Sequence, residues 1–145
     1  MKSDFKGFTL IEILVVTFII SLLFTFTLPH FSSIVLKLEQ KKFLHQFVHT
    51  ISLAATNAIS FNKPSYFFID GHNRTYGLSE KVYSIPENVE IYASGLKEIT
   101  PGLYYIYFYP DGTANQAEIE IIYGRKKYII NINPLTSTIR WKEAG

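Results

Sequence analysis

The stretch KGFTLIEILVV at residues 6–16 decides the fold of this chain, because it opens a long apolar segment. Between residues 8 and 28 the sequence contains one charged side chain, Glu12. At a rise of about 1.5 Å per residue, a helix over this segment is roughly 30 Å long, which is the thickness of the hydrocarbon core of a bilayer. We therefore expect a transmembrane helix over residues 8–28.

Glu12 is unusual in such a segment. A carboxylate at the centre of a transmembrane helix costs about 2.5 to 3.5 kcal/mol on insertion scales, so it indicates a functional role. Pairing with a positive charge in a medium of low dielectric constant reduces that cost. Two interpretations follow: Glu12 meets a cationic partner, or the segment is a plain membrane anchor that tolerates one acid near the interface.

The residues before the apolar segment differ from a secretory signal. Such a signal has a basic start, an apolar stretch of about 7 to 15 residues and then a cleavage site of small residues. Lys2 and Lys6 supply the basic start, but the apolar stretch is longer and runs into Pro29-His30-Phe31. Gly7 is the small residue between the charged start and the apolar run, and it precedes the segment.

These residues resemble the cleavage and methylation motif of type IV prepilins and type II secretion pseudopilins. The shared pattern is a short charged leader, a glycine, an aromatic residue, and an acid at the fifth position after the glycine. The resemblance implies that a prepilin peptidase removes residues 1–7 by cutting between Gly7 and Phe8, and then methylates the new amine of Phe8. It also implies that Glu12 neutralises the terminal amine of a neighbouring subunit, and that Pro29 kinks the helix.

After Pro29 the helix is predicted to continue as an amphipathic helix over residues 29–61. Proline removes an intrahelical hydrogen bond and crowds the preceding turn, so a bend is expected there. Asn62-Lys63-Pro64 should end the helix, because a residue before proline is pushed out of helical geometry. Apolar residues recur at steps of three and four: Phe43, Leu44, Phe47, Val48, Ile51, Ala54, Ala55, Ala58 and Ile59.

Beyond Pro64 the apolar pattern changes to a period of two, which predicts an antiparallel β domain over residues 62–145. The clearest hairpin turns at Gly124-Arg125, and the acids Glu118 and Glu120 should lie on its solvated face. Alternate aromatic residues of the strand at 103–109 are expected to fill the core, with a subunit interface as the alternative. The predicted strands are 66–69, 75–78, 82–85, 89–93, 103–109, 117–123, 127–132 and 138–141.

Three further segments are similar to the GspH/FimT family of minor pilins and pseudopilins. They are AATNAI at residues 54–59, FYPDGT at 108–113, and YIINI at 128–132 followed by TSTI at 136–139. The resemblance implies an α+β, pilin-like fold, in which a long kinked N-terminal helix, its first half transmembrane, packs on a small antiparallel domain of two sheets. The chain departs from the family at Thr56, where arginine is common, and at Ser137, where glycine is common.

Composition and motifs argue against catalysis. The chain has no cysteine, no glycine-rich phosphate loop and no serine in a nucleophile motif. His45 and His49 stand one helical turn apart, but no third ligand is near in sequence, so neither a metal site nor a cofactor is expected. The net charge is +2, and +1 once residues 1–7 are removed, so nothing in the composition demands a polyanionic partner.

The favoured function is that of a minor pseudopilin at the tip of the pseudopilus of a type II secretion system, which exports folded proteins. The expected partners are the prepilin peptidase, other pilin or pseudopilin subunits and the inner membrane. We expect a single pass through the inner membrane, with the C-terminal domain in the periplasm.

The alternative is a FimT-like minor pilin of a type IV pilus, which binds DNA during uptake. Two basic clusters support it, one at a hairpin turn and one near the C-terminus. If these ends lie together, they would form a basic patch with an aromatic platform, which suits single strands and phosphate backbones. The residues are Arg125, Lys126, Lys127, Arg140, Trp141 and Lys142.

Overall fold

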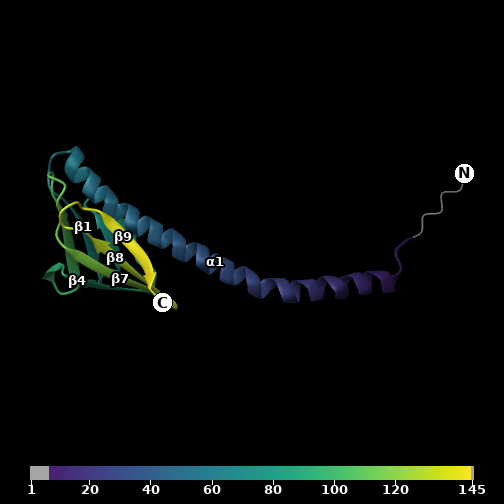
Figure 1. The fold of residues 1–145 in the computed structure, drawn as a ribbon. Coiled ribbons are helices and arrows are strands. Elements are labelled where there is room, and N and C mark those ends of the chain that lie inside the picture. Colours follow the sequence, from purple (N-terminus) through teal and green to yellow (C-terminus); the bar gives the residue numbers. More distant parts are fainter. Residues whose placement is uncertain (1–6, 145) are drawn as a thin grey trace, which may run out of the picture. The chain divides into compact units, whose positions relative to one another are not determined.

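The computed structural model describes residues 7–144, apart from the side chains of residues 26–34 and of Lys97. Within this range the chain forms one long helix, α1 (Leu10–Ser60), followed by strands that all pair antiparallel (Figure 1). The chain divides into two compact units, Met1–Lys42 and Phe43–Gly145, and α1 contributes to both. The predicted α+β class with two antiparallel sheets is confirmed.

The first unit holds the N-terminal part of α1. Its described apolar side chains are exposed, as Leu10 and Leu23 illustrate. The transmembrane assignment of residues 8–28 is not confirmed, because no helix within the described residues is long and apolar enough to cross a membrane. Pro29, the predicted kink, lies among residues 26–34, whose side chains are outside the described part of the chain.

In the second unit, residues 43–60 of α1 supply one wall of the core. The buried side chains recur at steps of three and four, as the sequence predicts. Thr50 is a buried polar residue, and its hydroxyl donates to the Gln46 carbonyl at 2.7 Å, so its burial leaves no hydrogen bond unmade. The helical core residues are Phe43, Leu44, Phe47, Ile51, Ala54 and Ala58.

The end of α1 has a specific geometry. Asn62 adopts a left-handed conformation with φ of 49°. Its N–H donates to the Ile59 carbonyl at 3.3 Å, and the Lys63 N–H donates to the Ala58 carbonyl at 3.2 Å. This pair of bonds is the Schellman arrangement that satisfies the last carbonyls of a helix. Pro64, which follows, cannot continue the helix, so the sequence and the backbone agree on where it ends.

Five strands form the first sheet, in the order β3-β2-β1-β6-β5. Phe67 and Ile69 of β1 face the core together with Ile106 and Phe108 of β6. The strands are β1 (Ser65–Asp70), β2 (Thr75–Leu78), β3 (Lys81–Ser84), β5 (Lys97–Thr100) and β6 (Leu103–Phe108).

β5 was missed by the sequence analysis. It is short, its register with β6 shifts between Glu98 and Thr100, and it is bounded by Gly95 and by Pro101-Gly102. Turn residues at both ends and a broken period of two hide such a strand from pattern analysis. The remaining strands were predicted to within a few residues.

Four strands form the second sheet, in the order β4-β7-β8-β9. Most of the buried residues on its inner face are isoleucine and tyrosine, for example Ile119, Ile121 and Ile130, each with no exposed surface. Glu118 and Glu120 point away from this core, as predicted. The strands are β4 (Val89–Ser94), β7 (Ala117–Tyr123), β8 (Lys126–Ile132) and β9 (Ile139–Ala144).

Ser137, one of the two departures from the GspH/FimT pattern, has a structural explanation. Its φ is 51°, a left-handed conformation that glycine adopts at least cost. The side chain is nearly buried, and its hydroxyl donates to the Gly112 carbonyl at 2.7 Å. This bond, which links the turn before β9 to the turn after β6, offsets part of the backbone cost of serine at this position.

Candidate processing and assembly site

The predicted scissile bond lies just outside the helix. Gly7, Phe8 and Thr9 precede α1 and have no regular secondary structure. The Phe8 side chain is 80% exposed, and a Cβ placed on Gly7 would meet no atom within 4 Å. The peptide bond between Gly7 and Phe8 is therefore in an open, non-helical stretch, which a peptidase can reach without unwinding α1.

Thr9 fixes the start of the helix. Its carbonyl accepts hydrogen bonds from the N–H groups of Glu12 at 3.1 Å and of Ile13 at 3.2 Å. Its Oγ1 also accepts from the Glu12 N–H, at 3.3 Å. Thr9 is thus the N-cap residue, and it satisfies a backbone donor that the first turn of a helix leaves unpaired.

Glu12 occupies the first turn of α1, three residues after the cap. The order Thr9-x-x-Glu12 is that of a capping box, and a negative charge at this position is favoured by the helix dipole. Glu12 therefore stabilises the helix start whether or not a partner binds it. The sequence analysis missed this role, although the spacing of threonine and glutamate was readable.

Hydroxyl side chains further along the first unit are bonded to their own helix. Thr17, Ser21 and Thr25 donate to the carbonyls four residues earlier, at 2.5, 2.8 and 2.9 Å. Such bonds remove the cost of placing a hydroxyl in an apolar medium. These polar residues are consequently compatible with an environment that offers no water.

The predicted basic cluster is divided by the fold. Lys126 and Lys127 form ion pairs with Glu143 at 2.6 Å and with Glu120 at 2.7 Å. The hydrogen bond that the Lys126 ammonium donates to the Glu143 carboxylate raises the pKa of Lys126. Both ammonium groups are therefore neutralised by neighbours within the four-stranded sheet, which leaves Arg125, in the exposed turn between β7 and β8, outside these two pairs.

The C-terminal cluster is divided between the two faces of β9. Trp141 is opposite the buried Ile130 in the register, and its ring lies 6.0 Å from that of His45 and 6.2 Å from that of Tyr128. Arg140 and Lys142 alternate with it and face away from the core. The structure therefore does not bring the six residues together as a patch with an aromatic platform.

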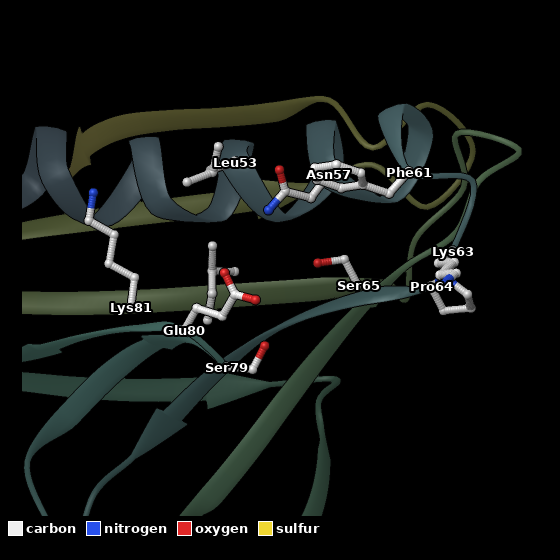
Figure 2. Close-up of a pocket in the computed structure, with 10 residues that line it drawn as sticks. Leu53, Asn57, Phe61, Lys63, Pro64, Ser65, Ser79, Glu80 and Lys81 are labelled. Atoms are coloured by element: carbon white, nitrogen blue, oxygen red, sulfur yellow. The ribbon is translucent and has the colours of Figure 1, made fainter.

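A cleft in the second unit is another candidate for a functional site (Figure 2). Its volume is about 670 Å³, and it lies between the end of α1 and the β2–β3 turn. Its polar side chains come from α1, the segment leading into β1, and the β2–β3 turn, and neither of the ion pairs within the described residues involves them. Nor do any three histidine, aspartate or glutamate side chains among the described residues group as metal ligands. The cleft is lined by Leu53, Asn57, Phe61, Lys63, Pro64, Ser65, Leu78, Ser79, Glu80 and Lys81.

Comparison with known families agrees with the N-terminal geometry. Residues 2–28 match the family model described as the prokaryotic N-terminal methylation motif. No curated protein and no solved structure matches the chain. The chain thus carries the processing motif of the type IV pilin and pseudopilin superfamily, and the match supports a pilin-like or pseudopilin protein.

Proposed function

We propose that this protein is a minor pseudopilin of a type II secretion system, part of the pseudopilus tip that assists protein export. The observation that carries the proposal is the methylation motif at residues 2–28, together with the open chain at Gly7 and Phe8. A helix followed by a small domain of two antiparallel sheets supports the GspH/FimT assignment. In this role the protein is structural, and no catalytic activity is proposed for it.

The first unit supports an anchor in the inner membrane. Apolar side chains are exposed around α1 from Leu10 to Phe24, and the hydroxyl groups among them bond to the helix backbone. A surface of this kind requires an apolar environment, which a bilayer or neighbouring helices of other subunits provide. We propose a single pass, with the domain that begins at Phe43 in the periplasm.

Glu12 is proposed to pair with the methylated amine of a neighbouring subunit. The open N-terminus and the first-turn position of Glu12 support this role, because both groups lie at the same end of α1. Glu12→Ala should leave membrane insertion intact but reduce incorporation into filaments. Glu12→Gln keeps the size of the side chain but removes its charge, so it should reduce incorporation into filaments as much as Glu12→Ala does.

The test of processing is intact-mass analysis of the full chain expressed with and without a prepilin peptidase. Co-expression should remove residues 1–7 and add one methyl group to Phe8. Gly7→Val should block cleavage, whereas Glu12→Gln should still be cleaved, which separates processing from assembly. An intact leader in cells with an active peptidase would overturn the proposal.

The second candidate is a FimT-like minor pilin that binds DNA. The exposed side chains of Arg140 and Lys142, side by side on the outer face of β9, support it. Against it, Lys126 and Lys127 are paired with acids, and the Trp141 ring lies beside His45 and Tyr128 on the other face of β9 from Arg140 and Lys142. A gel-shift titration with the full chain in detergent, at low and moderate salt, tests this candidate. Lack of any salt-sensitive shift would eliminate it.

A further inference from the structure

The outer face of the four-stranded sheet is an ordered grid of side chains. The strand register places Ser94, Glu118, Asn131 and Arg140 in one row across the sheet. The next row contains Tyr92, Glu120, Ile129 and Lys142, and the third contains Glu90, Ile122, Lys127 and Ala144. These rows point away from the core, because the residues between them along β7 and β8 are buried.

Charge is divided across this grid. The acids Glu90, Glu118 and Glu120 all lie on β4 and β7. The bases Lys127, Arg140 and Lys142 all lie on β8 and β9. Only the pair in the middle, Glu120 with Lys127, is close enough for an ion pair within this face. One half of the face is therefore acidic and the other half is basic, and we call it the charge-divided face.

The charge-divided face also carries apolar side chains, on its central strands β7 and β8 and on its edge strand β4. Tyr92 is 56% exposed, and Ile122 and Ile129 are half-buried. The Tyr92 hydroxyl donates to the Glu90 carboxylate of the same strand at 2.9 Å. Apolar side chains surrounded by charged ones are the usual composition of a protein–protein contact.

We propose that the charge-divided face binds the same face of a second copy of this chain. If the two-fold axis runs parallel to the strands, β4 and β7 of one copy lie over β9 and β8 of the other. The acidic half then covers the basic half on both sides of the axis, as an isologous contact requires. An axis perpendicular to the strands within the face would stack acids on acids, so the charge pattern selects one orientation.

The size of the face determines when the contact forms. Four strands spaced about 4.8 Å apart and five residues of about 3.4 Å cover roughly 300 to 350 Å² per copy. Stable complexes in solution bury about 800 Å² per partner, so the contact is weak between free molecules. Anchoring both copies in one membrane raises their effective concentration. To this extent the inference rests on the proposed function.

Cross-linking of the full chain in membranes tests the inference. The protein has no cysteine of its own, so Asn131→Cys places a single thiol on β8, next to the proposed axis. A short bis-maleimide should give a dimer band. Val82→Cys, an exposed position of β3 that belongs to the other sheet, is the matched control and should not cross-link. Equal cross-linking at both positions would overturn the inference.

Charge reversal tests the orientation. In the Asn131→Cys background, Glu118→Lys or Arg140→Glu should each reduce the dimer band at least fivefold. Each substitution gives residues 118 and 140 the same sign of charge, so like charges of the two copies face each other. Co-expression of the two variants with different tags should restore a mixed dimer, since opposite charges again face each other. An undiminished band in the single variants, or failure of the mixture to recover, would overturn the inference.

Two readouts separate this inference from the proposed function. Intact mass shows whether residues 1–7 are removed, and fractionation shows whether the chain is in the membrane. A processed, membrane-bound chain without the Asn131→Cys dimer contradicts the inference alone, whereas an unprocessed chain contradicts the proposed function. A cross-link to a band of a different size identifies another subunit as the occupant and overturns the assignment to a second copy.

Discussion

The two sheets of the second unit follow the same alternation but expose different chemistry. The outer face of the four-stranded sheet carries the acids and bases of the charge-divided face. The outer face of the five-stranded sheet carries four neighbouring rings, of which Tyr66 and Tyr105 are 5.2 Å apart and Tyr105 and Tyr107 are 6.1 Å apart. We call these rings, Tyr66, Phe68, Tyr105 and Tyr107, the outer aromatic cluster.

This difference shows what alternation can and cannot reveal. In β7, glutamate alternates with isoleucine, so the buried side is evident from the letters alone. In β6, LYYIYF offers apolar residues on both sides, and the sequence analysis expected the tyrosines to fill the core. Ile106 and Phe108 are buried instead, and Tyr105 and Tyr107 face outward. That expectation was wrong for these two tyrosines. Both faces of the strand are apolar, so the sequence pattern alone does not tell which face is buried.

The largest loss of stability is expected from a substitution in the core of the second unit. Phe47 of α1 is fully buried, and its ring lies 4.7 Å from that of Tyr76 and 5.2 Å from that of Phe67. Phe47→Ala should cost about 3 to 5 kcal/mol of unfolding free energy, through lost burial and the cavity left behind. Denaturant unfolding of the full chain, followed by fluorescence of the single tryptophan, measures it. Phe61→Ala, at an exposed ring, is the control.

Buried tyrosines should make stability depend on alkaline pH. Burial raises the pKa of Tyr76 from 10.0 to about 12. Between these values the unfolded chain loses the phenol proton while the folded chain keeps it, so unfolding becomes easier as pH rises from 10 to 12. Below pH 10 the phenol is protonated in both states, so the full stability of the folded chain is retained there. Tyr76→Phe should flatten this slope in unfolding curves, and an unchanged slope would contradict the role of Tyr76.

Ser137 tests the link between the two sheets. Ser137→Ala loses the hydrogen bond to Gly112 but keeps the left-handed backbone, so it should destabilise the fold by about 1 to 2 kcal/mol. Ser137→Gly loses the same bond but relieves the backbone, so its loss should be smaller. Denaturation midpoints of the two variants give the comparison. Alanine as stable as glycine would show that backbone conformation does not matter there.

Substitutions on the outer faces should reduce stability less than those in the core, and the two faces should differ in how the loss depends on salt. Tyr107→Ala removes ring contacts with Tyr66 and Tyr105, worth about 0.5 to 1.5 kcal/mol beyond burial. That loss should be insensitive to salt. A loss that instead varied with ionic strength would show that the outer aromatic cluster depends on charge, and would weaken the contrast between the two faces.

The smallest effect is expected at the ion pair of Lys126 and Glu143. Both side chains are partly exposed, so solvent screens their attraction. Lys126→Met should shift the denaturation midpoint less than any variant above, and the shift should disappear in high salt. Because the pKa of Lys126 is raised, the ion pair contributes to stability at neutral pH. This stabilisation is lost only as the pH rises through the pKa that Lys126 has in the folded chain. A midpoint shift that persists in high salt would contradict this account.

Local sequence determined the N-terminal motif, the helix end and most strands. The processing pattern around Gly7 and Glu12 is a matter of order along the chain, and the end of α1 at Ser60 follows from the limits that Pro64 places on the residues before it. Strand positions were readable wherever polar and apolar residues alternate. β5 was not, since its register is irregular.

Tertiary structure alone decided which faces the ambiguous residues take and which charges meet. Trp141 was placed with Arg140 and Lys142 by proximity in sequence, but β-strand geometry turns alternate residues to opposite faces and sends Trp141 toward His45. Likewise the separation of acids from bases on the four-stranded sheet depends on strand order and register. Those are set by the packing of one sheet against α1 and the other sheet, which no local pattern encodes.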